Sequence, residues 1–512
     1  SYQRFATIVK MFCHGFRYTF TPAANQHEVA IHIEPSEESK ASIFKHDAGA
    51  IAKNTKDYVL NLNTKQLREG TATPPSGDNG GSPGQGAPGG GTPGNHAPRD
   101  GGAAPVVVEK GNVIVTPVVE TKEKNGKVAE RIAAIPAGEI DEIVRHLSTE
   151  NKQVVVSAGT MEKGEVMKVV IPARLFVQAR EKVENSSVVA QTDKAAYHLP
   201  TTEIATLLSD AAKELGVDVG QMDVAIAMNV TEAPTLPLRT VSNAVEFHVT
   251  ITAGGKEKKV ERFTQYVQRE MFVGESFDPK RSVAVRLNED GTMTVVPTLF
   301  SGNKAVAKSL MNSTYVIVEG NVAFQDVHNH WAKPYIEPLA AKQIVKGISN
   351  VMYAPNIAMT RAQFAVLLAR ALGLPAVRYD GRFKDVRGDE WFVQDGQWMA
   401  AVQYGIIKGN RNGAFEPNEP ITRAQAVVML ERAMRLPFVQ YDFSQLDRQK
   451  TLGDFKDEKE IGDWAKKAVE IVYRAGIVHG KANGRFDANE CVTRAQMAKM
   501  LYGFLTKANL ME

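Results

Sequence analysis

TRAQFAVLLARA, residues 360–371, returns in altered form as TRAQAVVMLERA at residues 422–433 and as TRAQMAKMLYGF at residues 493–504. In each copy Thr is followed three residues later by Gln, the pattern of a capping box, in which each side chain satisfies a free backbone N–H at a helix start. Apolar residues then recur at intervals of three and four, which predicts an amphipathic helix. Because no single unit can bury its apolar stripe alone, we expect the three helices to pack together as a central bundle.

Further residues repeat in register around the tetrapeptide. Each unit opens with Phe-x-Asp, a Trp follows that Phe, and a Gly stands 14 positions before the Arg of the tetrapeptide. This arrangement predicts a helix–loop–helix unit in which the Asp caps the first helix and the Gly allows a turn with positive φ. The Trp side chains fit either a buried anchor or an exposed ring that stacks on a sugar. The recurring residues are Asp326, Asp385 and Asp457; Trp331, Trp391 and Trp464; and Gly347, Gly409 and Gly480.

The arginine of each tetrapeptide is the residue that capping and packing do not explain. Arg361, Arg423 and Arg494 directly follow the cap, where a positive charge is mildly unfavourable beside the positively polarised start of a helix. One such residue would be read as a solvated side chain, but three in register indicate function. Since a guanidinium can hold a carboxylate through two parallel hydrogen bonds, the sequence predicts three anion sites at the helix starts.

The combined pattern resembles the S-layer homology family, with repeats at residues 324–378, 383–437 and 452–508. The resemblance implies a pseudo-threefold unit that binds the secondary polysaccharide of a Gram-positive-type cell wall, commonly one carrying pyruvylated N-acetylmannosamine. It also implies that the arginines contact the acidic sugar, while the Trp, Asp and Gly residues named above shape each groove. The chain departs from the family pattern, because its tetrapeptide ends in Gln instead of Glu. The first repeat also has Gln343 and Val351 where the other two have glycine, so we expect three unequal grooves.

The rest of the chain has different sequence patterns and composition. Residues 106–320 combine strand-like alternation with helical spacing, including a predicted helix at residues 201–215 with Thr201 or Thr202 as its cap. We predict an α+β, β-rich module there, and no catalytic motif stands out in it. Residues 71–105 are rich in Gly and Pro and predict a disordered linker, and residues 1–70 indicate a truncated β-rich segment. The predicted fold class is therefore multidomain: a β-rich middle region followed by an all-α three-repeat pseudo-trimer with a central helix bundle.

Composition argues against several classes of partner. The net charge of +3 is too small to indicate a nucleic-acid partner. The sequence contains no run of 18 or more uncharged apolar residues, so no membrane insertion is expected. His328 and His330 lack a third ligand nearby in the sequence, so no metal site and no cofactor are expected.

These observations favour a non-catalytic extracellular protein of the cell wall or surface layer. Its repeats would hold it non-covalently on an acidic secondary wall polysaccharide, and self-association in a surface layer is a further option. The alternative is the C-terminal anchoring part of a polysaccharide-degrading enzyme whose catalytic domain lies upstream. Both share the anchor, so the repeats do not separate them. A binding module at residues 106–320 is a third option, although no aromatic cluster marks it.

Overall fold

The computed structural model describes residues 106–125, 127–274, 276–410 and 412–512, together with four strands between residues 16 and 69. The chain divides into two compact units, residues 1–99 and 100–512. In the first unit the four strands form one antiparallel sheet in chain order. The predicted linker at residues 71–105 lies outside the described residues. The four strands are β1 (Phe16–Pro22), β2 (Glu28–Pro35), β3 (Lys56–Asn61) and β4 (Leu67–Glu69).

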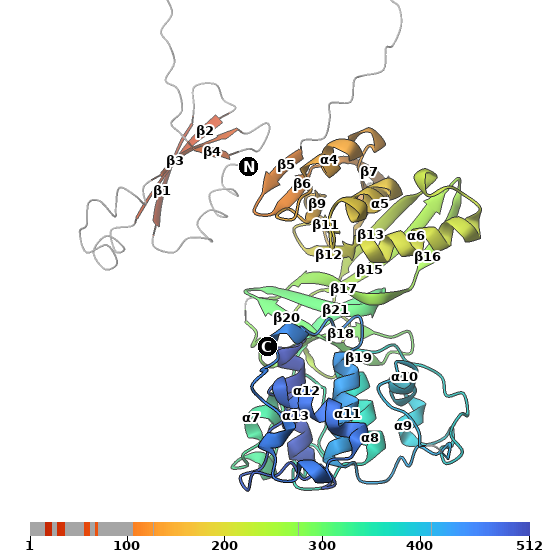
Figure 1. The fold of residues 1–512 in the computed structure, drawn as a ribbon. Coiled ribbons are helices and arrows are strands. Elements are labelled where there is room, and N and C mark those ends of the chain that lie inside the picture. Colours follow the sequence, from red (N-terminus) through yellow and green to blue (C-terminus); the bar gives the residue numbers. More distant parts are fainter. Residues whose placement is uncertain are drawn as a thin grey trace, which may run out of the picture. The chain divides into compact units, whose positions relative to one another are not determined.

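Within the described residues, the second unit begins with two large sheets (Figure 1). The ten-stranded sheet has the order β19-β18-β22-β15-β13-β10-β8-β7, with β14 paired to β22 and β16 paired to β15. The eight-stranded sheet has the order β20-β21-β17-β12-β11-β9-β6-β5. The bounds are β5 (Val106–Glu109), β6 (Asn112–Val115), β7 (Val118–Lys124), β8 (Lys127–Ala134), β9 (Gln153–Ser157), β10 (Val166–Pro172), β11 (Ser187–Gln191), β12 (Ala195–Pro200), β13 (Asp223–Thr231), β14 (Arg239–Thr240), β15 (Ala244–Ala253), β16 (Lys256–Val260), β17 (Arg262–Phe272), β18 (Ser282–Leu287), β19 (Met293–Val296), β20 (Thr298–Ser301), β21 (Lys304–Met311) and β22 (Ser313–Glu319).

The two sheets share one hydrophobic core, in which the ring of Tyr197 from β12 lies 5.0 Å from that of Phe247 from β15. Three helices accompany the sheets: α4 (Ile140–His146), α5 (Ala173–Lys182) and α6 (Thr201–Leu215). The fold class predicted for this region, β-rich with a few helices, is confirmed.

The predicted cap of α6 is wrong. Its N-cap is Pro200, and the side chain of Thr201 donates instead to the carbonyl oxygen of Ser186 at 3.1 Å. Thr201 is fully buried, so its hydroxyl is satisfied by a neighbouring strand end instead of by the start of its own helix.

The helical repeats follow, and the three predicted helices start where the tetrapeptides predicted them. In all three, the Thr side chain accepts from the Gln backbone N–H while the Gln side chain accepts from the Thr backbone N–H. The predicted apolar stripes are buried, which confirms the central bundle. The helices are α7 (Lys333–Ala341), α8 (Arg361–Ala371), α9 (Trp391–Gln394), α10 (Gln397–Gln403), α11 (Arg423–Met434), α12 (Asp463–Arg474) and α13 (Arg494–Lys507). The stripe residues are Phe364, Leu367, Leu368 and Ala371; Ala426, Met429, Leu430 and Ala433; and Met497, Met500, Leu501 and Phe504.

The helix pairs of this bundle are formed between repeats. Helix α8 of the first repeat packs on α10 of the second, α11 of the second on α12 of the third, and α13 of the third on α7 of the first. A ring of backbone hydrogen bonds follows the same circuit: Met359 donates to Val492, Val492 to Ile421, and Ile421 back to Met359, at 2.9, 2.9 and 2.8 Å. The three repeats therefore close on one another, and none of them is a complete folding unit alone.

The repeats and the β-rich region share a further core. The hydroxyl of Tyr266 in β17 donates to the carbonyl oxygen of Leu372 at 2.7 Å, and Val283 and Val316 pack in the same cluster as the central helices. Figure 1 shows β18 to β21 beside the helical repeats. In the part of the chain that is described, no helix is both long enough and apolar enough to cross a membrane.

Candidate functional site

Each tetrapeptide arginine reaches out of its own repeat into the loop of the next one. Nε of Arg361 donates to the carbonyl oxygen of Phe415 at 3.0 Å, and Nε of Arg423 donates to that of Phe486 at 2.8 Å. The circuit closes when Nε of Arg494 donates to the carbonyl oxygen of Tyr353 at 2.8 Å. Every candidate groove is therefore built from two repeats, one supplying the arginine and the other the loop.

The guanidinium groups also stack on the aromatic rings of these same loop residues. The arginine Cζ atoms lie 5.0 Å from the ring centroid of Phe415, 4.9 Å from that of Phe486 and 4.3 Å from that of Tyr353. Such contacts stabilise a charge that is partly removed from water.

The expectation that packing has no use for these arginines is wrong. Arg361 and Arg423 are only 8% and 5% exposed, because their long apolar stems cross the neighbouring repeat while the head groups bond its backbone. Burial lowers the pKa of all three guanidinium groups. The loop side chain of Glu416, Asp487 or Tyr353 partly opposes this shift, and so does the Phe-x-Asp aspartate of the contacted repeat. Packing explains where the arginines lie, but it leaves part of each head group without a protein partner.

The three head groups differ in how many donors the protein uses. Nη2 of Arg423 donates to the carbonyl oxygen of His479 at 3.2 Å, and Nη2 of Arg494 donates to that of Lys346 at 2.7 Å. Among the described residues, no hydrogen bond engages Nη1 of either arginine, nor Nη1 or Nη2 of Arg361. Each head group thus keeps at least one Nη without a protein acceptor among the described residues, and Arg361 keeps both.

The Phe-x-Asp aspartates hold the loops in place. Asp457 accepts from the backbone N–H groups of Phe486 and Asp487 at 2.7 and 2.8 Å, and Asp326 and Asp385 make the equivalent pair of bonds in their own repeats. The second donor of each pair belongs to a residue with positive φ, as at Asp487 with φ of 56°. The prediction that these aspartates cap the first helix is therefore wrong, since two strong backbone donors of the loop take their oxygens instead.

The repeated glycines are needed for close approach, and not for a left-handed turn as predicted. None of the three has positive φ. A Cβ added to Gly347 would lie 2.3 Å from the carbonyl oxygen of Ser349, and one added to Gly409 would lie 2.5 Å from the ring of Phe383. One added to Gly480 would lie 3.0 Å from the ring of Phe455, the opening Phe of the third repeat. The opening Phe of each repeat packs directly against this glycine, which leaves no room for a side chain.

The repeated tryptophans lie on the surface. Trp331, Trp391 and Trp464 are 54%, 56% and 63% exposed, whereas Trp398 of α10 is fully buried. Of the two roles that the sequence left open, the exposed ring is the one observed. An exposed indole offers a face for stacking that a core anchor cannot.

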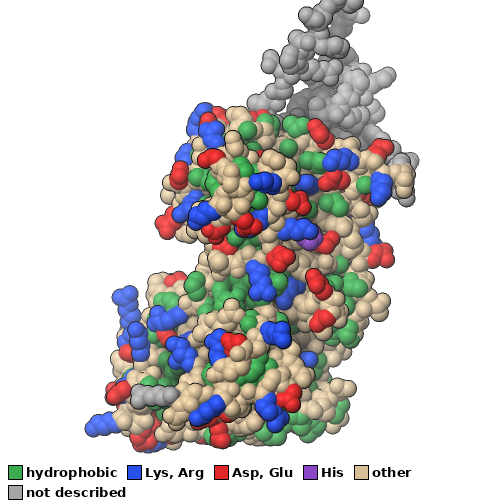
Figure 2. All heavy atoms as spheres, turned by 90° about the vertical axis from the view of Figure 1, so that its right-hand side faces the viewer, with side chains coloured by type: hydrophobic (Ala, Val, Ile, Leu, Met, Phe, Trp, Pro, Cys, Tyr) green, Lys and Arg blue, Asp and Glu red, His purple; other side chains and the backbone are tan. Residues whose placement is uncertain are grey.

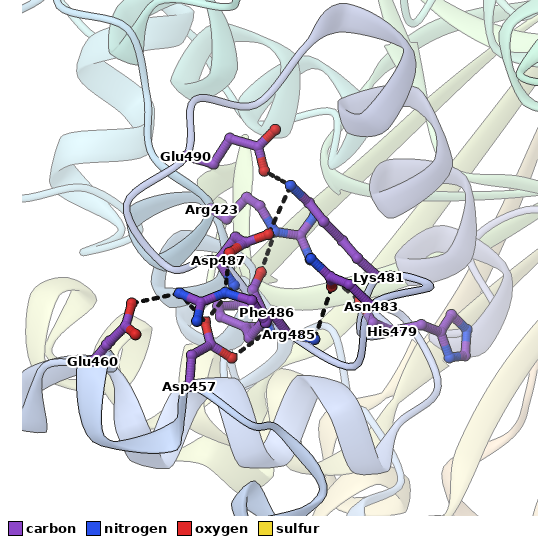
Figure 3. A network of polar contacts seen from close by, with 10 residues as sticks. All are labelled: Arg423, Asp457, Glu460, His479, Lys481, Asn483, Arg485, Phe486, Asp487 and Glu490. Carbon is purple, nitrogen blue, oxygen red and sulfur yellow. Dashed lines mark hydrogen bonds and ion pairs between the residues drawn. The ribbon is translucent and has the colours of Figure 1, made fainter.

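The third loop carries a dense network of ion pairs, which Figure 3 shows around Arg423. Arg485 bonds Glu460 at 2.6 Å and Asp487 at 2.9 Å, and Lys481 pairs with both Asp487 and Glu490. The first loop has exposed apolar residues instead, among them Ile348, Val351 and Ile357. The loops are therefore chemically unequal.

Sequence reasoning missed the aromatic partners of the arginines. Tyr353, Phe415 and Phe486 recur in register, eight positions before an arginine, so the signal was present. However, each ring stacks on the arginine of the preceding repeat around the circuit, and not on the arginine that follows it in the chain. Spacing within one repeat does not contain that information.

Comparison with known proteins agrees with this geometry. Residues 323–365, 382–427 and 454–498 match the family described as S-layer homology domain. The chain thus carries three S-layer homology domains, and the resemblance drawn from the tetrapeptides is confirmed. These domains anchor proteins to the cell wall, which places the chain at the cell surface, associated with the wall.

The similar proteins fall into two groups. An amylopullulanase of Thermoanaerobacterium thermosulfurigenes is 27% identical over 498 residues, which is 94% of this chain and 24% of that protein. An endoglucanase of Bacillus sp. (strain KSM-635) is 35% identical, over 36% of this chain and 19% of its own length. The S-layer protein Sap of Bacillus anthracis is 32% identical, over 35% of this chain and 20% of its own length. The chain spans about a quarter or less of each of these relatives.

Proposed function

We propose that the three arginine-bearing grooves bind an acidic secondary polysaccharide of the cell wall, one that carries pyruvate ketals. The observation that carries the proposal is the state of the guanidinium groups. Each is fixed by its Nε on a loop carbonyl, while at least one Nη has no protein partner among the described residues. A pre-positioned guanidinium with free donors suits the planar carboxylate of such a ketal.

The other repeated residues have distinct roles in this proposal. Trp331, Trp391 and Trp464 supply exposed rings for the sugar faces. The three aspartates and three glycines shape the loops and do not themselves contact the glycan. Because neither Nη atom of Arg361 has an acceptor among the described residues, its groove is expected to contribute most to binding.

The test is co-sedimentation of the whole 512-residue chain with purified wall sacculi. One variant changes all three arginines to Lys, which keeps the charge but removes the two-pronged donor. A second changes the three exposed tryptophans to Ala, which leaves the core untouched. Loss of a charged hydrogen bond weakens a groove roughly ten- to hundredfold, and the loss is larger for three grooves acting together on one polymer.

Two controls make the result specific. Phe272→Ala removes an exposed aromatic ring from the β-rich region and should leave binding unchanged. Sacculi treated with mild acid to remove pyruvate should bind the wild-type chain as weakly as intact sacculi bind the arginine variant. Undiminished binding by a folded triple-arginine variant, checked by circular dichroism, would exclude the arginines as ligand residues.

Two whole-protein roles are compatible with this anchor. One is a non-catalytic surface-layer protein that self-associates, which the S-layer relatives favour. The other is the wall-anchoring part of a polysaccharide-degrading enzyme. The amylopullulanase match favours this second role, because it covers 94% of the chain and so extends beyond the repeats into the β-rich region. Sequencing the complete reading frame separates them, since a glycoside hydrolase domain in the same frame is required only by the second.

A further inference from the structure

A large cavity lies where the β-rich region meets the first two repeats. Its volume is about 1260 Å³, and its walls come from β18, β19, the residues before α9 and the start of α10. Figure 2 shows both basic and acidic side chains around the hollow between the β-rich part and the helical part. None of Arg361, Arg423 and Arg494 lines it, and it shares with the Arg494 groove only Lys346, whose carbonyl oxygen accepts from Arg494.

Positive charge exceeds negative charge in this cavity. Five cationic side chains line it against three carboxylates. Two of the carboxylates are already engaged: Asp395 accepts from the backbone of Gln397 and lies 3.9 Å from Arg370, and Asp290 accepts from Thr292. The cations without an ion pair, judged over the described residues, are Arg262, Arg286, Lys346 and Arg378.

Arg286 is the most unusual of these cations. It is 4% exposed, and its acceptors are neutral: the amide oxygen of Asn288 at 3.3 Å and the hydroxyl of Thr294 at 3.2 Å. Over the residues that the structure describes, its Nη1 is buried without a hydrogen-bond partner, and so is Oε1 of Gln397 elsewhere in the cavity wall. A buried charge without a counter-charge costs several kcal/mol in general, so Arg286 lacks the compensation that buried ions normally have.

The neighbouring buried arginine shows how such a charge is stabilised when no ligand is needed. Arg269 donates to the carbonyl oxygens of Val267, Ser309 and Met311, and its head group lies over the rings of Tyr197 and Tyr315, although its Nε is also buried without a hydrogen-bond partner among the described residues. Arg286 has no carbonyl acceptor and no such ring contact among the described residues. The difference lies in position, since Arg269 is enclosed between the sheets whereas Arg286 borders the cavity.

We propose that this cavity binds an acidic sugar, with the sugar's oxyanion held by Arg262, Arg378 and Lys346 above the buried charge of Arg286. The volume exceeds what a single small ion needs. Asn288, Thr292 and Gln394 add neutral hydrogen-bonding groups of the kind that pair with sugar hydroxyls. A carboxylate and a phosphate share the chemistry that these cations recognise.

The experiment titrates the whole chain with glucuronate, inorganic phosphate and glucose by calorimetry. Glucuronate should bind, glucose should not, and phosphate should bind more weakly because it lacks the ring. Equal binding of phosphate and glucuronate would overturn the sugar assignment. Arg262→Gln with Arg378→Gln should weaken glucuronate binding at least about tenfold. Arg382→Gln with Arg448→Gln removes the same charge from exposed positions outside the cavity and should have no effect.

A second variant tests the buried charge. Arg286→Met should raise the melting temperature of the ligand-free chain, since replacing an uncompensated buried ion by an apolar group is often stabilising. It should also reduce the rise in melting temperature that glucuronate produces. An unchanged glucuronate response in both cavity variants would overturn the proposal. So would loss of the response in the triple-arginine groove variant alone, because the sugar would then be binding in the grooves.

Discussion

Nε of Arg494, the first residue of the last helix, donates to the carbonyl oxygen of Tyr353 across 141 positions of the chain. The same arginine stacks on the ring of Tyr353 and bonds the carbonyl oxygen of Lys346 through Nη2. The third repeat thus completes the first, and the module closes as a ring of three. Its stability and its candidate grooves depend on the same contacts.

Arg494→Lys should loosen this closure. The carbonyl oxygens of Tyr353 and Lys346 accept from two different nitrogens of the planar guanidinium, and the single nitrogen of a lysine ammonium cannot reproduce that spacing or stack flat on the ring. We therefore expect a loss of about 1–3 kcal/mol in the free energy of unfolding. Urea unfolding followed by circular dichroism measures it. Arg448→Lys, at an exposed position, is the matched control, and equal stability of the two variants would contradict the closing role.

Gly409→Ala should destabilise the second repeat. Its Cβ would lie 2.5 Å from the Phe383 ring and 2.9 Å from the Ala414 carbonyl oxygen, and overpacking of this kind costs about 1–3 kcal/mol. Gly388 lies in the same repeat with nothing within 4 Å of an added Cβ. Gly388→Ala should therefore leave the melting temperature unchanged, and a similar loss in both variants would argue against a steric cause.

The Phe-x-Asp aspartates should differ in how much they stabilise their loops, according to how deeply each is buried. Asp457 is nearly inaccessible, whereas Asp385 is exposed, although each accepts two backbone hydrogen bonds. Asp457→Asn turns an amide N–H₂ toward a buried backbone donor and should lower the free energy of unfolding by about 2–3 kcal/mol. Asp385→Asn should lower it by about 1 kcal/mol, because water can replace the lost hydrogen bond there. Chemical unfolding of the two variants gives the order, and a larger loss for Asp385→Asn would contradict this account.

Stability should rise in mild alkali because of Lys342. Its Nζ donates to the carbonyl oxygens of Pro279 and Ser282, both at 2.7 Å, and burial lowers its pKa from 10.5 to about 8. Between these values the unfolded chain binds the proton and the folded chain does not, so stability increases with pH there. We expect the increase between about pH 8 and pH 10.5 in wild type and not in Lys342→Met. Identical pH profiles would rule out Lys342 as the titrating group.

The features that could be predicted from the sequence are local ones. The capping boxes of Thr360, Thr422 and Thr493 involve residues three positions apart, and the apolar stripes span a few turns of one helix. The interpretations that failed all concerned partners distant in the chain. The Asp oxygens bond loop donors about 30 positions away, as from Phe415 to Asp385, and the glycines are constrained by the opening Phe of the repeat.

By itself, the sequence determined the number of repeats, the start of each central helix and which recurring Arg and Trp residues were candidates for binding. Only the tertiary structure decided which loop each arginine meets and that the third repeat returns to the first. It also decided that four cationic residues gather around one cavity without ion-pair partners in the part of the chain that the structure describes. The physical reason is that helix caps and apolar stripes depend on residues only a few positions apart in the chain. The order of the repeats around the ring depends on the burial of three helices against one another, and the spacing of residues within one repeat does not contain that information.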